Sequence, residues 1–497
     1  MHILSIARAL LAVTLLLSAT NAIASVKETL HAEVRGMVRS AGLAKARIAV
    51  SVRDCRNNRE IVAIHATRAM IPASNMKVFS TGAALLELGS EFRFQTELRW
   101  NGSDLVLIGD GDPSIANPDT FKDLRMRTPD GVVRDFDEEA ILNLWVQSAR
   151  KAGLRSVGSF LIDDRIFEHT FVHPSWKKDQ LNRPYSAEVA GLNFYLNCIQ
   201  FDPVPATPRP DWSEHRPKSP WIYERAKNSS ANAKKGQSHA PWIAGKAGAD
   251  TFQFRGTIKH RSGAPVSVTV QDPPVFMSRL ITDRLNDAGI SVSQIRRVGE
   301  TERYEEGTII EPIISTPILP LVEHCNEESQ NLYAEALLKR TVAKRTGRSG
   351  SWEDADMVMK AIIRDQFGLD AEGLLTGVFF DDGSGLSRNN RINAALTTAW
   401  LTQLQSEDFG EAFIDSLAEG GREGTLKRRF PDYMPNGAVV DAKSGYINGV
   451  SCLSGYVSFP NGSRYAFSVL VNNATDIGKA KALQESVATA IAKRFGR

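Results

Sequence analysis

The stretch IPASNMKVFS, residues 71–80, is the part of this 497-residue chain from which its fold and chemistry are best approached. It places Ser74 and Lys77 three residues apart, at the start of a run whose apolar residues recur with helical spacing. Residues i and i+3 share one face of a helix, so the hydroxyl and the amine would be neighbours. A buried lysine loses its charge readily and can then take a proton from a serine hydroxyl. Taken alone, the pair is better explained by an ordinary surface helix, because such spacing arises about once or twice by chance in a long chain.

The composition is that of a soluble globular protein, with 42% hydrophobic and 24% charged residues. The length leaves room for two or three domains and a well-buried core. The net charge of +3 is small beside 60 basic and 57 acidic residues, so electrostatics give no reason to expect a nucleic acid as partner.

The N-terminus has the pattern of a secretory signal peptide at residues 1–24. Arg8 precedes the apolar run at 9–17, and a small-x-small site ends at Ala24, directly before Ser25. We expect an exported mature protein that begins near Ser25 and acts in the periplasm or at the outer face of the cytoplasmic membrane. No later apolar run is long enough to span a bilayer, so no transmembrane anchor is expected after cleavage. A retained, uncleaved anchor is the alternative.

Neither the cysteines nor the histidines have the spacing of a metal site. The four cysteines are scattered along the chain: Cys55, Cys198, Cys325 and Cys452. In an exported protein they can form disulfides, with three possible pairings if all four are oxidised. His169 and His173 stand at i and i+4 but lack an acidic partner and a third ligand. We therefore expect neither a metal nor another cofactor.

The first part of the chain predicts a helix, two strands and then the helix that bears Ser74. These elements are expected at residues 26–40, 47–54, 60–66 and from 74 onward. Between 92 and 315 the pattern changes to short alternating strands with occasional helices, which predicts one or two inserted accessory domains, mostly β. Within them, residues 203–242 are rich in Pro, Ser, Asn and Lys and are expected to form long loops.

After Pro317 the pattern predicts long helices, three strands and a final helix. The helices are expected at 318–327, 332–345, 353–367, 394–405 and 479–494, and the strands at 437–445, 450–459 and 464–472. The fold class expected is α/β, of the α+β kind, with an antiparallel sheet covered by helices and completed by the two N-terminal strands. This catalytic domain would be discontinuous, formed by residues 25–91 and 316–497.

A second polar motif, Ser329-Gln330-Asn331, stands at the start of the helix expected at 332–345. A serine at this position is more simply explained as a helix cap. The asparagine offers both a donor and an acceptor, which suits the binding of a peptide amide.

A third motif, Lys443-Ser444-Gly445, ends one predicted strand, and Tyr446 leads into the next. A lysine on a strand is normally solvated surface. A glycine beside it lets a ligand backbone approach closely, and a lysine with a serine can bind a carboxylate by charge and hydrogen bond.

The ordered set Ser-x-x-Lys, Ser-x-Asn and Lys-Ser-Gly resembles the penicillin-binding protein and serine β-lactamase superfamily. Roughly 250 residues separate the first two motifs. An insertion of this size resembles the class C low-molecular-mass penicillin-binding proteins, the D-alanyl-D-alanine carboxypeptidase and endopeptidase family. Further stretches that look like this family are SQNLYAEALLKR, DDGSGLSRNNRI, EGTLKRRF and AKSGYINGVSCLSGYV.

The resemblance implies an acyl transfer on peptidoglycan, with β-lactam antibiotics as covalent inhibitors. Ser74 would attack the carbonyl between two terminal D-alanines, and Lys77 would take its proton. Ser329 with Lys443 would pass a proton to the leaving amine. The oxyanion hole would be formed by the backbone N–H groups of Ser74 and Tyr446.

For substrate binding, the resemblance implies that Asn331 holds the acyl side chain and that Lys443 and Ser444 bind the terminal carboxylate beside Gly445. Two residues depart from the family pattern. Gln330 replaces the usual Asp, at a position that need not face the substrate. Tyr446 stands where the family often has a Thr or Ser whose hydroxyl helps to bind the carboxylate, and the change would favour endopeptidase cleavage of cross-links.

Three other functions compete with this interpretation. A β-lactamase of the same superfamily would need a deacylating glutamate motif, which is not evident. A non-catalytic cell-wall-binding scaffold is disfavoured because the Ser and Lys positions are all retained. A metallohydrolase would be sensitive to chelators.

Overall fold

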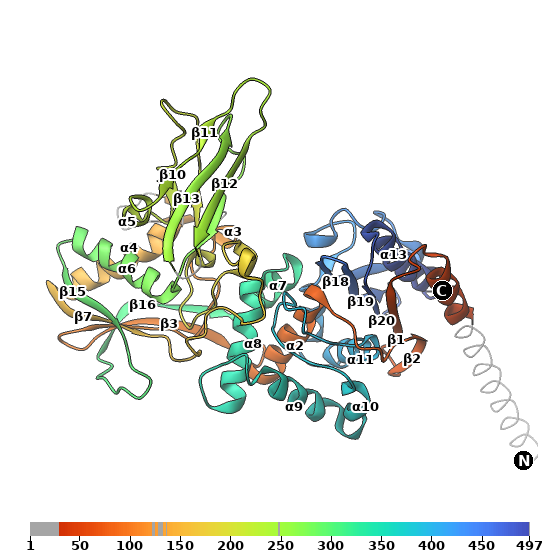
Figure 1. Cartoon of the computed structure of the whole chain (residues 1–497). Coiled ribbons are helices and arrows are strands. Elements are labelled where there is room, and N and C mark those ends of the chain that lie inside the picture. The colour runs from red at the N-terminus through yellow and green to blue at the C-terminus, as the bar shows by residue number, and fades with distance from the viewer. Residues whose placement is uncertain (1–28, 122–124, 128–132, 136, 247–248, 497) are drawn as a thin grey trace, which may run out of the picture. The chain divides into compact units, whose positions relative to one another are not determined.

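The computed structural model describes residues 29–121, 125–127, 133–135, 137–246 and 249–496 (Figure 1). The expected signal peptide at 1–24 and the expected start at Ser25 lie outside the described residues. The chain forms two compact units. The first comprises the residues up to Gly82 with Val322–Ser329 and Met359–Arg497, and the second comprises Ala83–Leu321 with Gln330–Val358.

The first unit contains a six-stranded antiparallel sheet in the order β17-β18-β19-β20-β1-β2. Its strands are β1 (Arg47–Asp54), β2 (Arg59–Ile64), β17 (Ala418–Glu419), β18 (Val439–Ile447), β19 (Val450–Ser458) and β20 (Arg464–Asn472). β1 pairs with β20 along its whole length, from Arg47 opposite Asn472 to Asp54 opposite Tyr465. The expectation that the two N-terminal strands complete a C-terminal meander is therefore confirmed.

Helices cover both faces of this sheet, as expected (Figure 1). On one face, Val50 and Val52 share a core with the helix at residues 29–40 and with α13 (Ile477–Arg494). On the other face, the Ser51 hydroxyl lies 2.7 Å from the Thr398 hydroxyl of α11 (Ala394–Leu404). The alternation of side chains along β1 thus sends successive residues to opposite helical layers.

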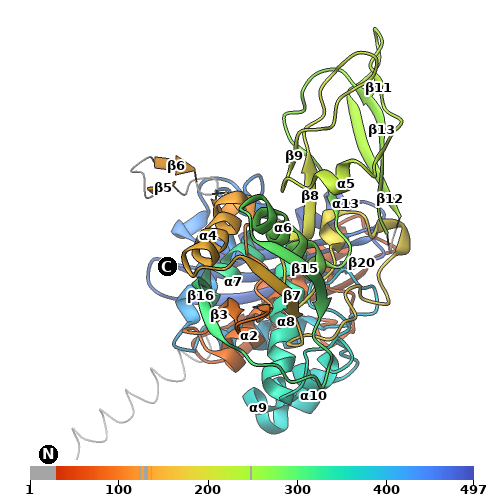
Figure 2. The same cartoon turned by 90° about the vertical axis from the view of Figure 1, so that its left-hand side faces the viewer.

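The second unit is built on a five-stranded sheet in the order β15-β7-β4-β3-β16. The strands are β3 (Arg93–Trp100), β4 (Leu105–Ile108), β7 (Ser156–Asp163), β15 (Ser291–Arg297) and β16 (Thr308–Pro317). Figure 2 shows α4 (Glu138–Lys151) and α6 (Pro273–Asp287) along one face of it, where they enclose a separate hydrophobic core. This sheet is mixed, because parallel pairs join β4 to β7 and β7 to β15, whereas antiparallel pairs join β3 to β4 and to β16.

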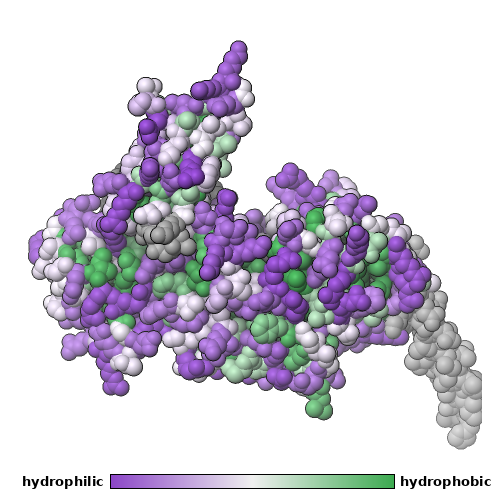
Figure 3. Space-filling view, in the orientation of Figure 1, coloured by the Kyte–Doolittle hydropathy of each residue, from purple (hydrophilic) through white to green (hydrophobic). Residues whose placement is uncertain are grey.

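The polar stretch at 203–242, expected to form long loops, also contains short regular elements. It forms α5 (Pro220–Tyr223), short strands and the start of β12 (Ala240–Lys246), next to β13 (Ala249–Ile258). Trp212 is fully buried and stacks on Phe254 with ring centroids 4.6 Å apart. One large ring can anchor a polar segment, which a count of apolar residues misses. The exposed turn at residues 233–239 is hydrophilic (Figure 3).

The remaining β pairings of the second unit are small. They involve β5 (Arg125–Arg127), β6 (Val133–Asp135), β8 (Cys198–Phe201), β9 (His215–Arg216), β10 (Lys227–Asn228), β11 (Ala231–Asn232) and β14 (Val266–Thr269). The other helices of four or more residues outside the 3₁₀ turns are α2 (Lys77–Leu88), α3 (Pro118–Phe121), α7 (Ile318–Glu327), α8 (Asn331–Thr346), α9 (Ala355–Phe367), α10 (Ala371–Leu375), α11 (Ala394–Leu404) and α12 (Gly410–Asp415).

Helix α8 belongs to the second unit, whereas the boundary expected at residue 316 would place it with the first unit. Its Arg340 donates to Asp110 at 2.8 Å, and its Lys339 donates to the Thr170 carbonyl at 2.9 Å. These bonds tie α8 to the second unit, whereas the sequence pattern of a helix does not show which neighbour it packs against.

The four cysteines are buried free thiols, so none of the three disulfide pairings occurs. Burial raises the pKa of both Cys198 and Cys452 to about 12. Among the described residues, no helix combines the length and apolarity needed to cross a bilayer.

Candidate active site

Ser74 and Lys77 are in direct contact in the first unit. Ser74 lies in a 3₁₀ turn, Ala73–Met76, and Lys77 is the first residue of α2. The Lys77 amine lies 3.2 Å from the Ser74 hydroxyl, and the lysine side chain is fully buried. The α-helix begins three residues later than expected, but the 3₁₀ turn preserves the contact because residues i and i+3 eclipse one another in it.

The loop at residues 381–392 supplies a second partner for Lys77. The Lys77 amine donates to the Ser384 carbonyl at 2.9 Å, and Ser80, one turn along α2, donates to the Gly383 carbonyl at 2.6 Å. Asp382 holds the loop in shape by accepting from the backbone N–H of Gly385 at 2.8 Å. Sequence reasoning noticed DDGSGLSRNNRI as a family-like stretch but gave it no role, because its contact with Lys77 is made by a backbone carbonyl.

Two unusual backbone conformations meet beside the nucleophile. Ala73 has φ +47° and Gly385 has φ +83°, and both lie in the left-handed region. A Cβ on Gly385 would lie 1.8 Å from the Ala73 carbonyl oxygen. Only a glycine fits there, so the loop can press against the turn that presents Ser74.

Strand β18 approaches the same turn from another side. A Cβ on Gly445 would lie 3.0 Å from the backbone nitrogens of Ser74 and Asn75. The Asn75 side chain donates to the Lys443 carbonyl at 2.7 Å and accepts from the Ser454 hydroxyl at 2.7 Å. Asn75 therefore fixes the nucleophile turn to β18. Sequence reasoning missed this residue, although it is the second letter of the quoted Ser-x-x-Lys motif.

The Lys443 side chain is fully buried, unlike a typical strand lysine. Burial, and next the charge of Lys77, lower the pKa of the Lys443 amine to about 7, against the opposing influence of Cys325 and Glu328. The two amines are thus close enough to repel. A lysine with a pKa near neutrality can both give and take a proton under ordinary conditions.

Ser329 lies in the short connection between α7 and α8 and belongs to the first unit. It has a left-handed backbone with φ +63° and is half-buried. Glu328, the preceding residue, is one of the charges that act on Lys443. Asn326 fixes α7 to the nucleophile helix, since its side chain lies 3.3 Å from the Thr81 hydroxyl. Ser329 thus directly follows a residue whose charge acts on Lys443, and Asn326 holds the preceding helix to α2.

Asn331 falls in the second unit, where its side-chain amide donates to the Tyr185 carbonyl at 2.7 Å. The structure does not bring it together with Ser74 in one compact unit. Tyr446 follows Gly445 on β18, and its side chain is 60% exposed. Its phenol is therefore turned away from the buried groups around Lys443.

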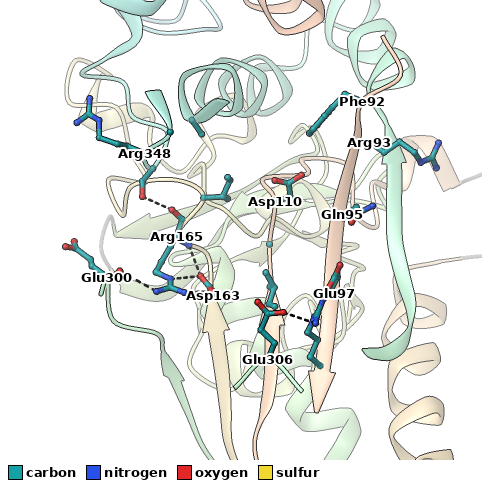
Figure 4. Close-up of a pocket in the computed structure, with 17 residues that line it drawn as sticks. Phe92, Arg93, Gln95, Glu97, Asp110, Asp163, Arg165, Glu300, Glu306 and Arg348 are labelled. Atoms are coloured by element: carbon teal, nitrogen blue, oxygen red, sulfur yellow. Dashed lines mark hydrogen bonds and ion pairs between the residues drawn. The ribbon is translucent and has the colours of Figure 1, made fainter. Parts of the chain in front are cut away.

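A cavity of about 920 Å³ lies in the second unit (Figure 4). Its lining, all from described residues, includes none of the predicted site residues. Arg165 donates to Asp163 at 2.6 Å, and Arg99 donates to Glu306 at 3.0 Å, so its charges are largely paired with one another. The volume of this cavity therefore does not identify it as the active site.

No group of three His, Cys, Asp or Glu side chains that could hold a metal ion occurs among the described residues. His169 instead lies 3.0 Å from Asp164, which also accepts from Arg297. The candidates for nucleophilic and acid–base chemistry in the first unit are therefore Ser74, Lys77, Ser329 and Lys443.

Sequence comparison decides which family this arrangement belongs to. The sequence model of the D-Ala-D-Ala carboxypeptidase 3 (S13) family matches residues 30–494. The chain belongs to this family. The expected class C low-molecular-mass penicillin-binding protein is thereby confirmed, and with it a serine peptidase.

Individual relatives agree with the D-Ala-D-Ala carboxypeptidase 3 family. A D-alanyl-D-alanine carboxypeptidase of Actinomadura sp. is 27% identical over 493 residues, covering 94% of this chain and 85% of the relative. The D-alanyl-D-alanine carboxypeptidase DacB of Haemophilus influenzae is 22% identical, with 84% of each chain covered. The crystal structure of penicillin-binding protein 4 (dacB) from Haemophilus influenzae has a TM-score of 0.72 at 19% identity, covering 93% of this chain and 99% of the other, which confirms the fold.

Proposed function

We propose that this member of the D-Ala-D-Ala carboxypeptidase 3 family cleaves peptidoglycan stem peptides through an acyl-enzyme on Ser74. The observation that carries the proposal is the 3.2 Å contact between the Ser74 hydroxyl and the buried Lys77 amine. An amine in that place can take the hydroxyl proton as the oxygen attacks. The substrate is the amide bond between the two terminal D-alanines.

In the first step the Ser74 oxygen bonds to the carbonyl carbon, and its proton passes to Lys77. This needs a neutral Lys77 amine. The Ser384 carbonyl orients the Lys77 amine by accepting from it.

The oxygen that becomes negative in this step is stabilised by the backbone N–H groups of Ser74 and Tyr446. The close approach of Gly445 to the Ser74 nitrogen supports this assignment, since it sets the Tyr446 end of β18 beside the nucleophile. Two fixed donors in a site with little water can each contribute about a hundredfold or more to the rate.

The C–N bond then breaks, and the leaving D-alanine nitrogen takes a proton relayed through Ser329 and Lys443. A Lys443 pKa of about 7 supports this role, because the amine can release and regain a proton near neutrality. Water next attacks the acyl-enzyme carbonyl carbon and gives a proton to Lys443, the Ser74–acyl bond breaks, and the oxygen of Ser74 regains its proton from Lys77. The same chemistry with a cross-linked amine as leaving group gives endopeptidase activity.

Lys443 and Ser444 are proposed to bind the terminal carboxylate, and Asn331 to hold the acyl side chain. β-Lactams would acylate Ser74 in place of the peptide. One neighbour of this fold, the Haemophilus influenzae penicillin-binding protein 4, has been crystallised with a β-lactam, at a TM-score of 0.66 and 18% identity. We further propose that the protein is exported and acts in the periplasm or at the outer face of the cytoplasmic membrane, where its substrate lies.

The experiment is a D-alanine release assay on a stem peptide that ends in D-Ala-D-Ala. The wild type should release D-alanine, Ser74→Ala should not, and a chelator should leave the rate unchanged. Release by Ser74→Ala would refute the acyl-enzyme. Rapid turnover of nitrocefin without D-alanine release would instead establish a β-lactamase, and binding to peptidoglycan without either activity would establish a scaffold.

A further inference from the structure

Thr425 places a hydroxyl beside Ser444, at the point where the proposed function expects a carboxylate. The Ser444 and Thr425 hydroxyl oxygens are 2.9 Å apart. Ser444 is half-buried on β18, and Thr425 is exposed in the short 3₁₀ turn Gly424–Leu426. The sequence analysis named EGTLKRRF, which contains Thr425, as a family-like stretch but gave this threonine no role.

The turn that carries Thr425 is held rigidly. The next residue, Leu426, is fully buried, and its carbonyl accepts from the Gly421 N–H at 3.1 Å. Gly424 has φ +51°, and a Cβ there would lie 2.6 Å from the Glu327 side chain and 2.8 Å from its carbonyl oxygen. The glycine thus lets the turn pack closely against the end of α7 and fixes the position of Thr425.

No described strand pairs with the edge of β18 beside the Lys443-Ser444-Gly445 motif. Strand β17 pairs with β18 at Ala442 and Asp441, and among the described strands no other one covers that edge. From Lys443 onward the edge is therefore left open. The Thr425 hydroxyl stands at this open edge, next to Ser444.

Position 446 carries no short hydroxyl side chain of the kind that the family often has there. Tyr446 occupies that place, and its side chain is 60% exposed. Two acids lie at the turn that carries Thr425: Glu423 is two residues before it, and the Glu327 side chain lies 2.6 Å from where a Cβ on Gly424 would be. A substrate carboxylate bound here would be repelled by these acids and needs several hydrogen-bond donors to hold it. Ser444 and Lys443 alone would leave one carboxylate oxygen with fewer hydrogen bonds than it can accept.

We propose that Thr425 is a binding residue for the terminal carboxylate of the substrate, and that its hydroxyl replaces the one lost at Tyr446. This rests on the proposed function. Ser444 and Thr425 each donate one hydrogen bond to the carboxylate, while Lys443 supplies the positive charge. Their mutual hydrogen bond in the absence of substrate orients both hydroxyls.

The test compares Thr425→Val, which keeps the shape and loses the hydroxyl, with Thr425→Ser, which keeps the hydroxyl. Each is assayed on two stem peptides that differ only in the last residue, D-alanine or D-alaninamide. We expect Thr425→Val to lower kcat/KM about tenfold on the free acid, mainly through KM, because a hydrogen bond to a charged group is lost. On the amide it should change kcat/KM less than about twofold, and Thr425→Ser should behave as the wild type on both.

A second measurement uses the rate of acylation by benzylpenicillin, which has a carboxylate, and by its methyl ester, which has none. The same variant should be slower on the acid and unchanged on the ester. Equal effects on acid and neutral ligands, or no effect on either, would overturn the role of Thr425 while leaving the acyl-enzyme intact. A wild type that neither releases D-alanine nor is acylated would instead refute the proposed function itself.

Discussion

Gly445 faces Ser74 so closely that a Cβ at position 445 would lie 3.0 Å from the Ser74 backbone nitrogen and 2.9 Å from the Pro72 carbonyl oxygen. Both contacts are with backbone, which cannot swing aside as a long side chain can. The separation between β18 and the nucleophile turn is therefore set by the absence of a side chain at this position.

Gly445→Ala should slow acylation by a β-lactam about a hundredfold, because the strand must move away and the oxyanion donors separate. The measurement is the second-order rate constant with a fluorescent penicillin, with thermal unfolding as a check on folding. Gly36→Ala is the control, since Gly36 lies in the helix at 29–40 with nothing within 4 Å of a Cβ. If Gly445→Ala were acylated at the rate of the control, the close approach would have no part in catalysis.

The charge of Lys443 should set the alkaline limb of the pH profile. Its pKa is lowered to about 7, so the charge that attracts a carboxylate is lost as the pH rises through that value. The acylation rate constant for benzylpenicillin should fall above about pH 7, and it should fall less for the methyl ester, which has no carboxylate to lose and is affected only through the proton relay. Lys443→Arg should lower the rate on both ligands, because arginine releases no proton for the relay, and should abolish the extra decrease on the acid above pH 7, because arginine stays charged. Identical profiles for acid and ester would contradict this assignment.

Asp441 should make the first unit less stable at alkaline pH. Burial, and next Glu419, raise the pKa of Asp441 to about 7. The folded state thus holds a proton that the unfolded state releases near pH 4, and stability falls as the pH rises from about 4 through 7. Asp441→Asn should raise the Tm by roughly 2 to 4 °C at pH 8 and change it little at pH 4.

The control for that measurement is Asp432→Asn, because Asp432 is exposed in the same unit. It should leave the Tm unchanged at both pH values. A larger gain for Asp441→Asn at pH 4 than at pH 8 would reverse the sign and contradict the explanation.

Tyr446 should limit carboxypeptidase activity. Tyr446→Thr would return a hydroxyl to the open edge of β18, and we expect kcat/KM for D-alanine release to rise about five- to tenfold on the free acid. The same substitution should compensate for Thr425→Val. Tyr433→Thr is the matched control, since Tyr433 is another exposed tyrosine, 91% accessible. An unchanged rate in Tyr446→Thr would show that the tyrosine does not weaken carboxylate binding.

The sequence predicts the catalytic fold well because its elements have clear periods. β1 and β20 have dense apolar patterns, and the ordered motifs identified the superfamily before their spatial arrangement was known. The insertion was predicted less well. Trp212 anchors a polar stretch by one ring, and Lys339 and Arg340 tie α8 to the second unit through contacts that no local pattern reveals.

At the candidate site, the sequence predicts which side chains take part in the chemistry, but it does not predict the contacts that backbone groups make. Ser74 and Lys77 were expected to touch, and they do. The Ser384 carbonyl and the Asn75 bridge were not expected, because neither depends on a motif read along the chain. Thr425 likewise becomes visible only when the turn after β17 is seen beside β18.

The central claim is that Ser74 becomes acylated. The most direct measurement is mass spectrometry of the protein after incubation with benzylpenicillin and proteolytic digestion. The peptide that contains Ser74 should gain the mass of one penicillin molecule, and the gain should be absent from Ser74→Ala. A wild-type protein whose Ser74 peptide keeps its unmodified mass, or an adduct on another residue that persists in Ser74→Ala, would contradict the account.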